Sequence, residues 1–77
     1  MNESEWLLYF SDNLYDMMQE RKVTQRELSE MTGLAESTIS KYINGTNMPK
    51  AASIVNIAIA LECTTDELIH FGEMIDS

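Results

Sequence analysis

The chain has 77 residues, the length of one small domain, and it carries 13 acidic against 5 basic residues for a net charge of −8. Its single cysteine, Cys63, excludes an internal disulfide framework and fits a reducing cytosol. We expect no signal peptide, because the first residues are acidic, and no membrane span, because no apolar run approaches roughly 20 residues. With only three glycines and one proline, the composition favours helices.

The charges are sorted along the chain. All five basic residues lie in 21–50, where three acids leave a net charge of +2, whereas residues 1–20 and 51–77 hold five acids each and no base. The average charge argues against nucleic-acid binding, but this sorting concentrates the positive field on one segment. The simpler alternative is an acidic surface that keeps a small protein in solution.

Residues 4–21 are predicted to form one helix, with Ser4 as its N-cap. Its apolar stripe follows helical spacing and comprises Trp6, Phe10, Leu14 and Met17. The apolar run 6–10 is wider than one core face needs. Two interpretations stay open: packing against the C-terminal helix, or a dimer contact.

Residues 24–44 are predicted to form two short helices with a tight turn. Thr24 and Glu27 have the spacing of a capping box, and the helix that follows should turn Leu28 and Met31 inward. Gly33 is suited to a left-handed backbone at the turn.

The next helix, residues 36–43, should bury Ile39, Tyr42 and Ile43 and end at Gly45. Its outward side chains are mostly short, polar and capable of hydrogen bonding, which suits reading base edges. These outward residues are Glu36, Ser37, Thr38, Ser40 and Lys41.

A helix over 50–61 is almost entirely apolar, so we expect it to be the buried centre of the domain or partly a subunit contact. Thr64 and Glu67 form a second capping box that opens the last helix. That helix offers five apolar residues for burial: Leu68, Ile69, Phe71, Met74 and Ile75.

Three stretches in this order resemble the lambda-repressor-like helix-turn-helix family of Cro and xenobiotic-response-element type regulators: 23–29, 33–45 followed by Pro49, and 57–61 followed by 66–68. The resemblance implies an all-α fold of five helices, with the helix-turn-helix at the second and third. It also implies a single domain over 1–77, in which residues 1–10 extend the first helix. The chain departs from the family at Ala35, where a capping Ser or Thr is common, and at Glu62, where Gly is common.

The resemblance also implies which residues contact DNA. Gln25 matches the phosphate-binding residue that braces the recognition helix, and Asn44 matches the asparagine that touches phosphate after it. The positions that read bases in the family match Glu36, Ser37 and Lys41, and Ser40 is a neighbouring candidate. Thr38 matches a position that contacts the DNA backbone or the methyl group of a base. Arg26 and Lys50 are weaker phosphate candidates.

These observations predict a DNA-binding transcriptional regulator, a repressor that binds double-stranded DNA as a homodimer in a bacterial or phage cytoplasm. The alternative is an antitoxin-like or adapter module on the same fold, whose acidic ends hold a basic protein partner. We expect no enzyme, cofactor or metal site, because His70 is the only histidine and the chain shows no metal-ligand spacing and no glycine-rich phosphate loop.

Overall fold

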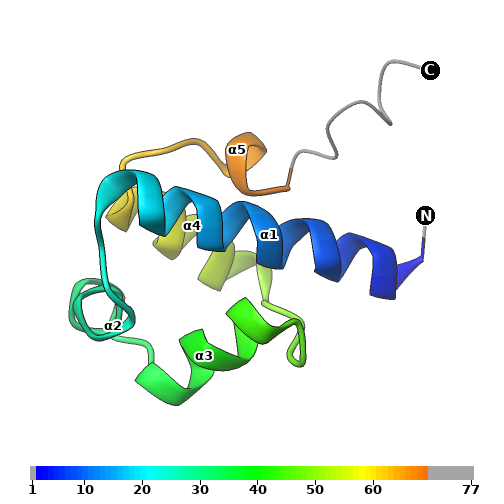
Figure 1. Ribbon diagram of the computed structural model, residues 1–77, viewed down its shortest axis with the longest axis horizontal. Coiled ribbons are helices and arrows are strands. Elements are labelled where there is room, and N and C mark those ends of the chain that lie inside the picture. The colour runs from blue at the N-terminus through cyan, green and yellow to red at the C-terminus, as the bar shows by residue number, and fades with distance from the viewer. Residues whose placement is uncertain (1, 70–77) are drawn as a thin grey trace.

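A computed structural model describes residues 2–69 of the chain, and these form five helices (Figure 1). The helices are α1 (Glu3–Arg21), α2 (Gln25–Thr32), α3 (Glu36–Asn44), α4 (Ala51–Ala60) and α5 (Thr65–Ile69). No strand occurs within residues 2–69, so the expected all-α fold of five helices is confirmed. Helix α1 packs against α3 and α5, while α2 packs against α3 and α4.

Helix α1 begins earlier than its sequence indicated. Asn2, not Ser4, is the N-cap, and its side-chain oxygen accepts a hydrogen bond from the Glu5 backbone N–H at 2.9 Å. The prediction of Ser4 was wrong because an N-cap needs extended backbone, which Asn2 has at φ −92° and ψ 173°, whereas Ser4 is already helical. At the other end Lys22 is left-handed, with φ 58°, and terminates α1 without glycine.

The core is built around the apolar stripe of α1. Phe10 and Leu14 are fully buried, and the ring of Phe10 stacks on Trp6 at 5.5 Å and meets Tyr42 of α3 edge-on at 6.0 Å. The stripe thus binds α1 to the helix predicted to read DNA. The remaining buried apolar side chains are Met17, Met18, Leu28, Ile39, Ile57, Ala58, Leu61 and Leu68.

One expectation about burial was wrong and another holds only for part of a helix. Met31 is 52% exposed, because a step of three residues places it about 60° around α2 from buried Leu28. Helix α4 buries Ile57 and Ala58, but Val55 and Ile59 are 48% and 72% exposed, so it is not buried on every side and the alternative of a subunit contact stays open. A domain this small has too few elements to surround a helix on every side, so composition alone overstates burial.

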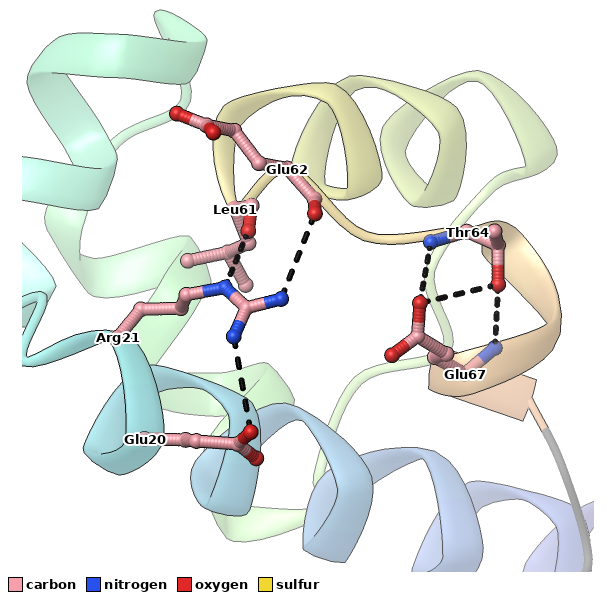
Figure 2. A network of polar contacts seen from close by, with 6 residues as sticks. All are labelled: Glu20, Arg21, Leu61, Glu62, Thr64 and Glu67. Atoms are coloured by element: carbon pink, nitrogen blue, oxygen red, sulfur yellow. Dashed lines mark hydrogen bonds and ion pairs between the residues drawn. The ribbon is translucent and has the colours of Figure 1, made fainter.

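The connection from α4 to α5 is held by Arg21 of α1 and by a capping box at the start of α5 (Figure 2). Arg21 donates from Nε to the Leu61 carbonyl at 3.0 Å and from Nη2 to the Glu62 carbonyl at 3.4 Å. Glu62 has a left-handed φ of 55°, a conformation that glycine adopts more easily. The predicted capping box follows, with Thr64 and Glu67 exchanging bonds of 2.9 and 3.2 Å. His70, Phe71, Met74 and Ile75 lie outside the described residues.

Candidate nucleic-acid interface

The first helix of the candidate interface, α2, starts with the capping box that the sequence predicted. The Thr24 hydroxyl accepts from the Glu27 N–H at 3.1 Å, and the Glu27 carboxylate accepts from the Thr24 N–H at 3.0 Å. Hydrogen bonds from the backbone N–H and the hydroxyl of Thr24 stabilise the ionised carboxylate, so they hold the pKa of Glu27 below its ordinary value of 4.5. The backbone N–H of Thr24 is the largest cause. The start of α2 is therefore set locally, by groups three residues apart.

The turn between α2 and α3 is braced by two hydroxyl groups of α2 that bond Leu34, the residue after Gly33. The Ser29 hydroxyl donates to the Leu34 carbonyl at 2.6 Å, and the Thr32 hydroxyl accepts from the Leu34 N–H at 3.1 Å. Gly33 has the expected left-handed φ of 79°. Asn56 of α4 donates to the Thr32 carbonyl at 2.7 Å, which ties the end of α2 to the helix beneath it. The angle between α2 and α3 is thus fixed by hydrogen bonds as well as by packing.

Helix α3 divides its side chains between the core and solvent. Ile39 and Tyr42 are buried and Ile43 packs against the core, as predicted. On the opposite side Glu36, Ser37 and Lys41 are exposed, while Thr38 and Ser40 are half-buried. No side chain caps α3, because Ala35 has no hydrogen-bonding group there. The five residues predicted to face DNA therefore share one helix, with the three named as base readers the most accessible.

The end of α3 is anchored to α1 by one buried hydroxyl. Ser11, only 5% exposed, donates to the Tyr42 carbonyl at 2.6 Å. Gly45 then ends the helix at φ 72°, and a Cβ added there would lie 3.3 Å from the Ser11 hydroxyl. This contact fixes where α3 stops and therefore where Asn44, its last residue, presents its amide.

Gln25 and Asn44 lie at opposite ends of the helix-turn-helix. Gln25 is the first residue of α2, Asn44 is the last of α3, and both are exposed. Amides at these two positions could each donate to a phosphate on either side of a groove occupied by α3. Phosphate contact by either residue stays a prediction.

The basic residues do not contribute equally to this surface. Arg21 is engaged with Leu61 and Glu62 and also pairs with Glu20 at 3.6 Å, which is the only ion pair within residues 2–69 (Figure 2). Arg26, Lys41 and Lys50 are exposed and make no ion pair in that range. The cations left for phosphate or base contact are accordingly few, and Lys41 is the one on the outward side of α3.

Sequence reasoning missed three residues that tie the helices together: Ser11 and Asn56, which brace the helix-turn-helix, and Arg21, which holds the connection between α4 and α5. Each bonds a backbone carbonyl far away in sequence, at separations of 31, 24 and 40 residues respectively. The available signal was a polar residue beside apolar ones: Ser11 directly follows the apolar run 6–10, and Asn56 lies between Val55 and Ile57 on a mostly apolar helix. Such residues need a partner when buried, although the sequence does not say which one.

Other chemistry finds little support within residues 2–69. No group of three or more His, Cys, Asp or Glu side chains is arranged to hold a metal there, and no helix in that range is long and apolar enough to cross a membrane. Cys63 packs against the core, and burial raises the pKa of its thiol above 9.0. A thiol in this state is a poor nucleophile at neutral pH.

Two short helices joined by a braced turn, with a polar outer side on the second, define a helix-turn-helix domain of the lambda-repressor-like class. The chain belongs to the helix-turn-helix family HTH_3, whose profile matches residues 14–68.

A solved structure agrees with this assignment of the fold. An HTH_3 family transcriptional regulator from Vibrio cholerae superposes on 96% of this chain with a TM-score of 0.88 at 15% sequence identity. The chain covers 42% of that protein, less than half its length. At this identity the likeness establishes the fold alone. A search of curated proteins gives no significant match.

Proposed function

We propose that the protein is a sequence-specific transcriptional repressor that inserts α3 into the major groove of DNA and acts as a homodimer in the cytoplasm. The observation that carries this proposal is the exposure of Glu36, Ser37 and Lys41 on a helix whose other side is locked into the core. A major groove about 12 Å wide admits one α-helix, and its base edges offer hydrogen-bonding groups to such side chains.

Three residues of α3 are assigned to base reading by their chemistry. The Lys41 ammonium donates to the O6 and N7 atoms of guanine, and the Glu36 carboxylate accepts from the N4 amino group of cytosine. Glu36 also repels phosphate, so it disfavours misplaced registers. Ser37 donates or accepts according to the base. The half-buried side chains of Thr38 and Ser40 contact the sugar–phosphate backbone or a thymine methyl group at the edges of the groove.

Phosphate contacts set the register of α3 in the groove. Gln25 and Asn44 donate amide N–H groups to phosphates at the two ends of the motif, and Arg26 and Lys50 add weaker charge contacts. With so few cations, binding should release few counterions and show a shallow salt dependence for a DNA-binding protein.

Selection from random duplex DNA at 50 mM and 200 mM salt tests the proposal. We expect enrichment of sites with two-fold symmetry, with half-sites one helical turn or about 34 Å apart, at both salt concentrations. Ser37→Ala and Lys41→Ala serve as matched variants, since each should change the selected bases. If the bound DNA shows no enriched sequence at either salt concentration, sequence-specific binding is refuted.

A second candidate function is an adapter that holds a basic protein partner. It is favoured by four exposed acids, Glu5, Asp12, Asp16 and Glu20, which lie within about an 80° arc of α1. Reversing two of them in an Asp12→Lys, Asp16→Lys variant separates the roles. An adapter loses its partner, whereas a DNA reader binds its site at least as tightly because the net charge is less negative.

A further inference from the structure

Helix α4 leaves one apolar side on the surface of the domain. Ala52, Val55 and Ile59 are exposed, and helical geometry places them within about a 60° arc, here called the α4 face. Val55 is 48% and Ile59 is 72% exposed. All ten residues of α4 are uncharged, unlike every other helix of this acidic chain. Within residues 2–69 nothing covers the α4 face.

Charge restricts where two copies of this chain can meet. Each copy carries a net charge of −8, so surfaces rich in acid repel one another. The outer side of α1 also exposes an apolar residue, Leu8 at 62%, but Leu8 sits in a shallow groove beside Glu5 and Asp12. Pairing that side with itself would bring carboxylates together. The α4 face carries no acid, which makes it the better self-complementary surface.

We propose that the α4 face is the homodimer interface and that its occupant is a second copy of this chain. This inference rests on the proposed function, because paired half-sites call for a paired reader. A two-fold axis near Val55 and Asn56 makes the two α4 helices antiparallel. Val55 then meets its own counterpart, and Ala52 leaves room for the partner's Ile59.

The ends of α4 fit the same arrangement. Lys50 precedes the helix as its N-cap and Glu62 follows it, and both side chains are exposed. In an antiparallel pair about 15 Å long, the end of one α4 that carries Lys50 lies beside the end of the partner's α4 that carries Glu62, and the two-fold axis repeats this pairing of ends at the other side. Opposite charges thus close both ends of an uncharged contact, while a parallel pair would place like charges together.

The interface is small, which sets the expected affinity. A contact built on a ten-residue helix falls at the low end of specific interfaces, below about 1,200 Å² in total. The free protein should therefore dimerise weakly, and two adjacent half-sites should drive pairing by raising the local concentration of the second copy. Self-association must be measured up to several hundred micromolar.

Sedimentation equilibrium of the full chain, with Ile59→Asp and the control Leu8→Asp, tests the interface. We expect the wild type and Leu8→Asp to share one dimer dissociation constant, and Ile59→Asp to raise it at least about tenfold, since each dimer would bury two carboxylates. Circular dichroism checks that both exposed-site variants fold. A strictly monomeric wild type, or an unchanged constant in Ile59→Asp, overturns the proposal. If residues 70–77 of the same chain cover the α4 face instead, Ile59→Asp destabilises a monomer, which also overturns it.

A charge-reversal cycle tests the antiparallel geometry in the absence of DNA. Lys50→Glu and Glu62→Lys should each weaken the dimer about tenfold, because each creates two like-charge contacts. The double variant should return to within about threefold of the wild type. Additive weakening in the double variant would refute the Lys50–Glu62 contact.

The same Ile59→Asp variant separates this inference from the proposed function. On a duplex with a single half-site, wild type and variant should bind equally. On a duplex with two half-sites, only the wild type should gain at least about tenfold in affinity. If neither duplex is bound, the proposed function fails, but the sedimentation experiment still tests whether the α4 face is the dimer interface. If both duplexes are bound equally by both proteins, the interface assignment fails and DNA binding stands.

Discussion

Ser11→Ala removes the one hydroxyl that ties the end of α3 to α1. Ser11 is 5% exposed and donates to the Tyr42 carbonyl at 2.6 Å. That carbonyl also accepts from the Gly45 N–H at 3.2 Å, so it keeps one partner after the substitution. The cost should accordingly be that of one lost hydrogen bond, about 1 kcal/mol, and not the larger penalty of a fully orphaned buried carbonyl.

For a domain of this size, about 1 kcal/mol lowers the melting temperature by roughly 4–8 °C. Thermal and urea unfolding followed by circular dichroism measure the change. Ser37→Ala is the matched control, because Ser37 is exposed on α3 and should alter stability by less than about 0.5 kcal/mol while changing base preference. An unchanged stability in Ser11→Ala would refute the anchoring role of this bond.

Four further substitutions probe the site and its supports. Lys41→Ala should relax base preference at one position of the selected site and weaken binding by about 1–3 kcal/mol in a fluorescence titration, whereas equal weakening on all sequences would mark Lys41 as a phosphate contact. Gly45→Ala and Gly33→Ala should each cost about 1–2 kcal/mol in urea unfolding because both glycines are left-handed, and Gly45→Ala should cost more because its Cβ meets the Ser11 hydroxyl at 3.3 Å while the Cβ at Gly33 meets nothing within 4 Å. Equal losses of stability in the two variants would show that the contact between the added Cβ at position 45 and the Ser11 hydroxyl has no energetic effect. Because the pKa of Glu27 is lowered by folding, its ionised form stabilises the protein above pH 4.5 and this contribution is lost as the pH falls through the folded-state pKa. Melting temperatures between pH 6 and pH 3 should therefore fall further for the wild type than for Glu27→Gln, and parallel curves would contradict the assignment.

The scaffold of the site was largely readable from the sequence because its signals are local. Both capping boxes pair groups three residues apart, so Thr24 with Glu27 and Thr64 with Glu67 specify helix starts without any tertiary contact. The left-handed turn at Gly33 follows from backbone sterics alone. Once Ile39 and Tyr42 are placed inward, the 3.6-residue period decides that Glu36, Ser37 and Lys41 point to solvent.

Burial was harder to predict, since it depends on which neighbour covers each side of a helix. Met31 and Ile59 are apolar, yet both are exposed because no element packs over their sides within residues 2–69. The position of Asn2 as the N-cap of α1 similarly depends on where the backbone leaves the extended conformation. Periodicity ranks the residues on one helix but does not supply the helix that covers them.

The amino-acid sequence alone determines the helices, the capping boxes of α2 and α5, the polar side of α3 and the family to which the motif belongs, since all of these depend on residues close together in the chain. Only the tertiary structure decided how the helices are held together. Ser11, Asn56 and Arg21 each find a carbonyl at least 24 residues away, a pairing that requires the folded arrangement of helices. Only the tertiary structure shows that the α4 face stays uncovered within residues 2–69, because the other four helices there pack against other sides of the domain.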